Sequence, residues 1–168
     1  MKIIDALLAE LEQEAQTTRR QLERIPQEHL TWKPHPKSMS LGQLALHIAT
    51  VPGNVAEIAA LDVVPNPPAF QQPEAATAAE LLPALTETVA KAKRALGGFD
   101  DAKMQATWRL QSNGKDLIAM PRVAVVRNIM LNHWYHHRGQ LQVYLRLLNV
   151  PVPSVYGPTA DENPFAAA

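Results

Sequence analysis

Hydrophobic positions return with a helical period in four stretches of the chain. In residues 3–25, leucine and isoleucine recur every three or four positions and build one apolar face, while charged and amide side chains occupy the other face. Pro26 ends that pattern. The same period returns in residues 41–58, 81–96 and 121–149. The sequence therefore predicts four amphipathic helices, of which the last is the longest.

Helix-start signals agree with this division. Ser40 stands before the second stretch with Gln43 three residues later, and Thr77 and Glu80 repeat the spacing before the third. In each pair the hydroxyl can accept a backbone N–H while the longer side chain reaches back to the cap residue. Pro52-Gly53 lies inside the second stretch, and the apolar period resumes in phase after it. We therefore expect a kink there and not a break.

The joints between the helices are long for a bundle and carry many prolines or turn residues: residues 26–39, 62–76 and 99–120. Asn113-Gly114 suits a two-residue turn, which predicts a small β-hairpin around residues 107–120. Four amphipathic helices of this length form a four-helix bundle, and long joints allow a crossover instead of a simple up-and-down order. The fold expected is all-α, with residues 1–168 as a single domain.

Charge and composition exclude several function classes. Lys+Arg and Asp+Glu both number 16, so no basic stripe is expected for a nucleic acid or an anionic membrane. The absence of cysteine removes disulfides, iron–sulfur clusters, thiolate zinc sites and a cysteine nucleophile. Any metal must be held by histidine or carboxylate. Neither a signal peptide nor an apolar span is evident, so a soluble cytoplasmic protein is expected.

Three of the six histidines lie on predicted apolar faces. His133 and His137 are separated by one helical turn, a spacing at which two imidazoles can share a metal ion. Trp134 stands where the HExxH motif has its glutamate, so the general base of a metalloprotease is missing. His47 lies on the apolar face of the second helix. Since burying an unpaired imidazole is costly, a shared cation would satisfy all three.

Three neutral nitrogens and a water make up an open, zinc-type site, which suits catalysis more than structure. The residues leave a second interpretation open, in which each histidine is buried separately and bonded to a carboxylate or hydroxyl. They also leave open His136, which could replace His137 as the partner of His133 but is expected to pack or to hydrogen-bond beside the site.

Other polar and aromatic side chains near these histidines are expected to have structural roles. Arg138, which together with Gln140 flanks the histidines, is expected to form a surface ion pair. Glu57 lies about three turns beyond His47, too far to share its ion. The remaining histidines and aromatic residues are expected to face solvent, pack in loops, or line the core or a groove: His29, His35, Trp32, Trp134 and Tyr144.

Two stretches, WKPHPKSMSLGQLALHIA and NHWYHHRGQLQVYLRLLNVPVPSVYGPTADE, resemble the signature stretches of the DinB-like family. The resemblance covers nearly the whole chain, and its sharpest part is the helix-two histidine together with HxxxHRGQL and YGPTADE. It implies a four-helix bundle, frequently a homodimer, with a divalent metal, commonly nickel or zinc. Carried over by motif position, the ligands are His47, His133 and His137.

The resemblance also implies a function. Characterised members of the family include thiol S-transferases that use bacillithiol or mycothiol, and a mycothiol-dependent maleylpyruvate isomerase. We therefore expect a metal-dependent enzyme that acts on a small-molecule substrate with a low-molecular-weight thiol; its catalytic residues are not assigned. Three imidazoles accept nickel, zinc and iron alike. The alternatives are a non-catalytic dimeric metal-binding or stress-response protein, and a metal-dependent hydrolase.

The C-terminal segment carries four prolines between residues 151 and 164 and should run extended. Such a tail could fold back and bring Tyr156, Asp161 or Glu162 near the open metal position. The simpler expectation is a tail laid on the surface, with Tyr156 as its packing anchor.

Overall fold

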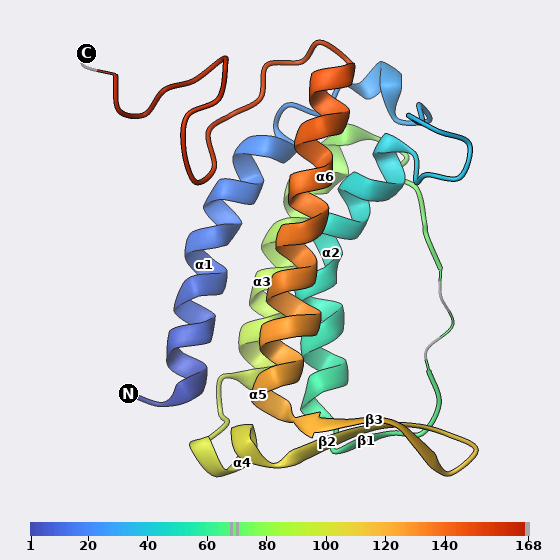
Figure 1. Cartoon of the computed structure of the whole chain (residues 1–168), viewed down its shortest axis with the longest axis vertical. Helices are drawn as coiled ribbons and strands as arrows, with labels where there is room; N and C mark the ends of the chain where they lie inside the picture. The colour runs from blue at the N-terminus through green and yellow to red at the C-terminus, as the bar shows by residue number, and fades with distance from the viewer. Residues whose placement is uncertain (68, 70, 167–168) are drawn as a thin grey trace.

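Four long helices stand side by side around one apolar core (Figure 1). The computed structural model describes residues 1–67, 69 and 71–166. The fourth long helix has three parts, which are a short α-helical start, a π-helical segment and an α-helical end. The helices are α1 (Ile3–Leu22), α2 (Leu41–Ala60), α3 (Leu81–Leu96), and the fourth, made of α5 (Arg122–Ala124), the π-helical segment (Val125–Asn132) and α6 (His133–Leu147).

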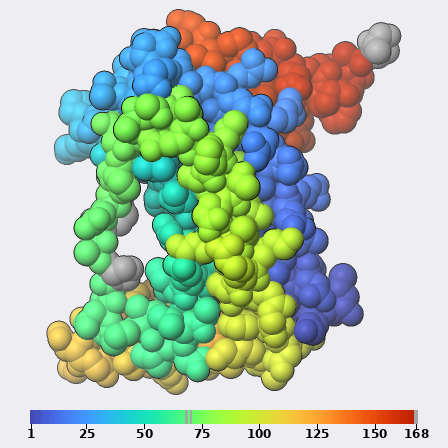
Figure 2. All heavy atoms as spheres, turned by 180° about the vertical axis from the view of Figure 1, so that it is seen from behind, coloured from blue at the N-terminus to red at the C-terminus, as the bar shows by residue number. Residues whose placement is uncertain are grey.

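The order of the helices is a crossover order, as predicted. In Figure 1, α1 and the fourth long helix run in one direction, while α2 and α3 run parallel to each other in the opposite direction. The joint between α2 and α3 therefore returns along the whole length of the bundle. Seen from behind, α3 lies between α1 and α2 (Figure 2). None of the helices in the described ranges is long and apolar enough to span a membrane.

A small sheet closes one end of the bundle. Strands β2 (Thr107–Ser112) and β3 (Lys115–Pro121) form the predicted antiparallel hairpin. Asn113 and Gly114 both have positive φ, at 51° and 75°, which a two-residue hairpin turn requires. The sequence did not predict β1 (Val63–Val64), which pairs in parallel with β2. It also missed the short helix α4 (Asp101–Gln105), because elements of two and five residues are too short to show a period.

The predicted capping boxes are present. The Ser40 hydroxyl accepts the backbone N–H of Gln43 at 3.1 Å, and the Gln43 side chain accepts the N–H of Ser40 at 2.9 Å. The Thr77 box begins a 3₁₀ turn, Ala78–Glu80, that leads directly into α3. Helix α1 ends at Leu22, three residues before the predicted end, because a tighter turn before Pro26 replaces the last helical bonds.

Pro52 lies inside α2 without breaking it, as expected. Proline has no N–H, so the carbonyl of Ile48 lacks its helical partner. The indole N–H of Trp134 donates to that carbonyl at 2.8 Å. One residue further on, the N–H of Gly53 donates to the Thr88 hydroxyl at 2.7 Å. The defect in α2 is thus filled by side chains from the fourth helix and from α3.

The contact at Gly53 is closer than any other residue would allow. A Cβ at this position would lie 2.6 Å from the hydroxyl oxygen of Thr88 and 2.9 Å from Cδ of Lys91. Only glycine therefore lets α2 and α3 approach this closely.

At the sheet end, the buried side chain of Arg122 joins three parts of the chain. It donates to the backbone carbonyls of Ala59 and Leu61, at the end of α2, and to that of Lys103 in α4. It also pairs with Asp62 at 2.5 Å. The last carbonyls of α2 thereby gain partners, and the sheet is fixed to the bundle.

Replacing Trp134 by Phe should lower the free energy of unfolding by about 1–3 kcal/mol, because the buried Ile48 carbonyl would lose its hydrogen bond. Denaturant unfolding measures this loss. Trp108→Phe is the matched control: its indole donates to the carbonyl of Ile58, which also accepts the N–H of Leu61. The control should lose less, and equal losses would contradict the role given to the Pro52 gap.

Candidate metal centre

The three histidines singled out in the sequence meet between α2 and α6. His47 comes from α2, and His133 and His137 come from the start of α6. One ring nitrogen of each lies within 4.8 Å of the others. The ring centroids of His133 and His137 are 4.5 Å apart, and His47 lies 4.6 Å from His137 and 5.3 Å from His133. The geometry is that of a cluster that can hold one divalent cation.

Two of the imidazoles have their outer nitrogen occupied. Nδ1 of His133 lies 3.3 Å from the carbonyl oxygen of Ile129, and Nδ1 of His137 lies 2.8 Å from Oε1 of Gln140. These oxygens accept hydrogen bonds, so we assign both rings the tautomer that carries the proton on Nδ1 and leaves a lone pair on Nε2. The two Nε2 atoms are 2.7 Å apart. In the assigned tautomer the two Nε2 lone pairs face each other, an arrangement that a shared cation would stabilise.

The donor set fits a divalent transition metal. Metal–nitrogen bonds of about 2.1 Å at a tetrahedral angle place two ligand atoms about 3.4 Å apart, so binding requires the two rings to separate by less than about 1 Å. Three imidazole nitrogens suit zinc, nickel and iron.

Burial keeps the cluster uncharged. Desolvation lowers the pKa of His47 to about 4, and the neighbouring His137 and His133 add to the effect. Desolvation is also the main cause that lowers the pKa of His133 and that of His137. All three rings are therefore neutral at pH 7, which is the form that binds metal.

No fourth protein ligand joins the three rings in the part of the chain that the structure describes. The three histidines are half-buried. His136 is exposed, with its ring centroid 5.0 Å from that of His137, and it is not a member of the cluster. Glu57 pairs with Lys91 at 2.8 Å, away from the site as expected. The arrangement is thus three protein nitrogens with no fourth protein ligand among the described residues.

The buried face of the fourth helix differs from the predicted one. The prediction placed His133, His137, Tyr144 and Leu148 on that face, but all four are only half-buried. The fully buried residues after Arg122 in this helix are Val126, Met130, Trp134, Arg138, Leu141 and Leu145, with Val125 and Leu131 beside them. The π-helical segment is the reason, because its i→i+5 bonds put more residues into each turn and rotate the residues of α6 about the helix axis. The histidines therefore lie at the edge of the core.

The expectation of a surface role for Arg138 was wrong. Its side chain is 2% exposed and pairs with Glu14 of α1 at 2.5 Å. The guanidinium also lies over the rings of Tyr135 and Tyr156, 5.0 and 5.1 Å from their centroids. The rotation that moves the histidines to the edge of the core turns Arg138 into it, where a carboxylate and two rings satisfy the charge.

The tail lies at the end of the bundle where α1 and α6 end, and it contacts both helices (Figure 1). The Tyr156 hydroxyl donates to Glu14 at 3.0 Å, Asp161 pairs with Arg146, and Glu162 pairs with Arg20. The tail lies on the surface as expected, but Tyr156 is not a packing anchor: its side chain is 69% exposed and holds the tail through its contacts with Glu14 and Arg138. The alternative, in which tail residues reach the metal position, was wrong because all three side chains are engaged elsewhere.

An aromatic pair lies beyond the cluster on the same face of α6. Tyr144 follows His137 by two helical turns, and its ring meets that of Trp32 edge-on at 5.7 Å. The Tyr144 hydroxyl donates to the carbonyl of Met39 at 3.2 Å.

Trp134 is fully buried in the core. In the first joint, His29 is half-buried and His35 is exposed, and neither joins the cluster.

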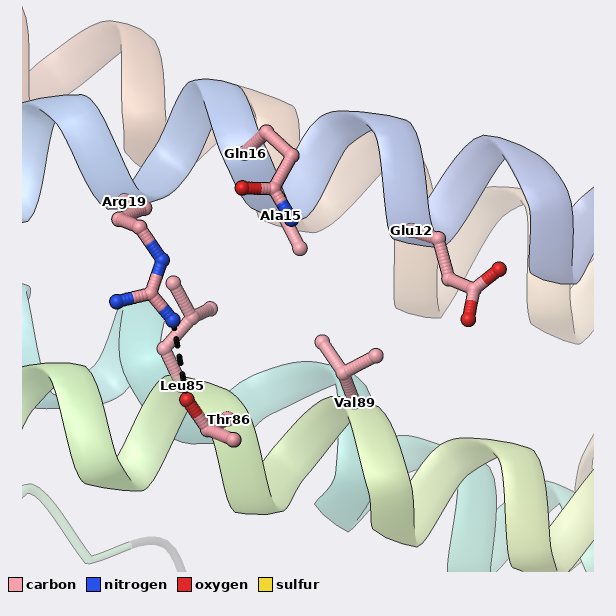
Figure 3. Close-up of a pocket in the computed structure, with 7 residues that line it drawn as sticks. All are labelled: Glu12, Ala15, Gln16, Arg19, Leu85, Thr86 and Val89. Atoms are coloured by element: carbon pink, nitrogen blue, oxygen red, sulfur yellow. Dashed lines mark hydrogen bonds between the residues drawn. The ribbon is translucent and has the colours of Figure 1, made fainter.

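A separate hollow of about 250 Å³ lies between α1 and α3 (Figure 3). Ala15, Leu85 and Val89 form its apolar part, and Arg19 donates across it to Thr86 at 3.1 Å. It lies on a different pair of helices from the histidines and offers no metal-binding cluster, so it is not the candidate site. Nothing in the sequence pattern predicted it.

The fold and this site define a four-helix bundle with a three-histidine cluster that can hold a divalent metal. The DinB family model matches residues 1–164, and the chain belongs to that family. A crystal structure of a DinB-like protein from Bacillus cereus ATCC 10987 is similar, with a TM-score of 0.70 and 22% identity over 91% of this chain and 97% of that one.

A second solved structure, a DinB-like protein from Bacillus subtilis, has a TM-score of 0.64 and 18% identity over 94% of this chain and 99% of that one. At these identities the likeness shows the fold alone. No curated protein matches the chain.

Without metal, the protein should lose stability as the pH falls from about 7.5 to about 4. The pKa of each cluster histidine is lower in the folded protein than in the unfolded chain, so the unfolded chain takes up protons first as the pH falls. The contribution of these histidines to stability is therefore complete above the unfolded pKa and is lost as the pH falls towards the folded pKa. Chelator-treated protein unfolded in urea at several pH values measures this. His47→Gln should flatten the dependence. Stability that rises on acidification would contradict the lowered pKa values.

Proposed function

We propose that this chain is a metal-dependent enzyme of the DinB family that uses a low-molecular-weight thiol. His47, His133 and His137 hold the divalent cation. The observation that carries the proposal is the 2.7 Å approach of the Nε2 atoms of His133 and His137, whose Nδ1 atoms each lie within hydrogen-bond distance of an oxygen. With His47 as the third donor, this is a ligand set and not three separate structural histidines.

The cluster has the features of a catalytic site more than those of a structural one. A structural metal site is closed by a fourth protein ligand, whereas the described residues supply three. The half-buried position leaves the fourth side for a substrate. This distinguishes the proposal from a closed, purely structural metal site.

The sulfur must come with the cosubstrate, because the chain has no cysteine. A free thiol has a pKa of about 8.5 and is mostly protonated at neutral pH, while only the thiolate attacks. A divalent ion held by three neutral imidazoles would supply the positive charge that lowers this pKa. The protein's own part is to keep the three rings neutral, aim their lone pairs inward, and leave one side free. The sulfur then forms a bond to the electrophile as its leaving group departs.

Metal content tests the ligand set. His47→Ala, His133→Ala and His137→Ala should each abolish stoichiometric metal, because two imidazoles hold a divalent ion far less tightly than three. His136→Ala is the matched control on the same turn and should keep the metal. Elemental analysis of protein purified without a metal-affinity column or chelator gives the answer. If His136→Ala lost metal as fully as His137→Ala, the assignment would be wrong.

Thiol binding tests the chemistry. Cobalt-substituted protein titrated with small thiols should develop a sulfur-to-metal charge-transfer band in the near ultraviolet, and this band should be absent in His133→Ala. Thiol-dependent consumption of a reactive electrophile should accompany it. If no thiol gave a band and no thiol-dependent turnover appeared, the transferase proposal would fail. A hydrolase that uses water at the same position, or a metal-binding protein without turnover, would then remain.

A further inference from the structure

We infer that Gln140 is a positioning residue that holds His137 in its Nδ1–H tautomer, while the carbonyl of Ile129 does the same for His133. Both histidines of α6 are then fixed to bind metal through Nε2. This inference rests on the proposed metal site and adds the groups that orient its ligands.

The Gln140 side chain has a geometry suited to this role. It lies one turn after His137 on the same side of α6, and its Oε1 is 2.8 Å from Nδ1. It is exposed, and this is the only side-chain hydrogen bond it makes within the described ranges. Gln140 therefore does not serve to pack the core. The contact fixes which ring nitrogen carries the proton and how the ring is turned.

The π-helical segment provides the partner of His133. In an α-helix, the backbone N–H of His133 would donate to the carbonyl of Ile129. Here that N–H donates to the carbonyl of Asn128, five residues back, and to that of Met130, and not to that of Ile129. The carbonyl of Ile129 is released from this backbone bond and receives Nδ1 of the His133 ring at 3.3 Å. The π-helical segment thus supplies the hydrogen-bond partner of the His133 ring, and π-helical turns are frequent at functional sites.

The two orienting groups differ in how they can be tested. The partner of His133 is a backbone atom and cannot be removed by substitution, whereas the partner of His137 is an exposed side chain. Removing such an orienting contact typically weakens metal binding by about 10–100-fold, because the free ligand then spends time in the wrong tautomer and orientation. A substitution at Gln140 therefore tests whether this contact positions the ring of His137.

The experiment compares Zn²⁺ affinity, measured by chelator competition, in the wild type and three variants. Gln140→Leu should bind zinc about 10–100-fold more weakly. Gln140→Glu should bind at least as tightly as the wild type, because a carboxylate also accepts the Nδ1–H. Gln142→Leu is the matched control: Gln142 lies on the other side of α6 and donates to the carbonyl of Pro153 at 3.4 Å. It should keep the wild-type affinity.

A second readout does not depend on metal. ¹⁵N NMR of the metal-free protein above about pH 7.5, where imidazole is neutral, should show His137 as the Nδ1–H tautomer in the wild type and in Gln140→Glu, and as a mixture in Gln140→Leu. An unchanged affinity or an unchanged tautomer in Gln140→Leu would overturn the inference. If the wild type bound no zinc, the proposed function would fail, and the tautomer measurement would still decide the role of Gln140.

Discussion

The hydrogen bond from Trp134 to the carbonyl of Ile48 fixes the fourth helix against α2. It exists because Pro52 leaves that carbonyl without a helical partner. Ile48 follows His47 in the chain and Trp134 follows His133, so the bond that repairs α2 also sets the distance between ligands on two helices. The position of the histidine cluster therefore depends on a defect in one helix and on its repair by the other.

The fourth helix separates two kinds of polar chemistry. On its core side, Arg138 is held by Glu14 and by the rings of Tyr135 and Tyr156, of which Tyr156 belongs to the tail. The carboxylates near α6 are thus committed to arginines: Glu14 to Arg138, Glu10 to Arg127, and Asp161 to Arg146. The cluster on the α2 side holds imidazole nitrogens alone, which favours transition metals over calcium or magnesium.

Much of the fold could be read from the sequence because its signals are local. Four long amphipathic periods, two capping boxes and the Asn113-Gly114 turn were all recognised, and each depends on residues a few positions apart. The metal-site candidates were found because His47, His133 and His137 shared a predicted face. That face was placed incorrectly, since a regular α period was assumed through a stretch that is π-helical. The burial of Arg138 was missed for the same reason.

By itself, the sequence determined the helices, their caps and the histidine chemistry, because each is set by side chains and backbone groups within a turn or two. The tertiary structure alone decided the pairing of β1 with β2, the contact of α2 with α3 at Gly53, and the tail anchored through Tyr156. It also decided that the three rings meet. These contacts join residues about 35 to 140 positions apart, and no local periodicity reports which distant surfaces will pack together.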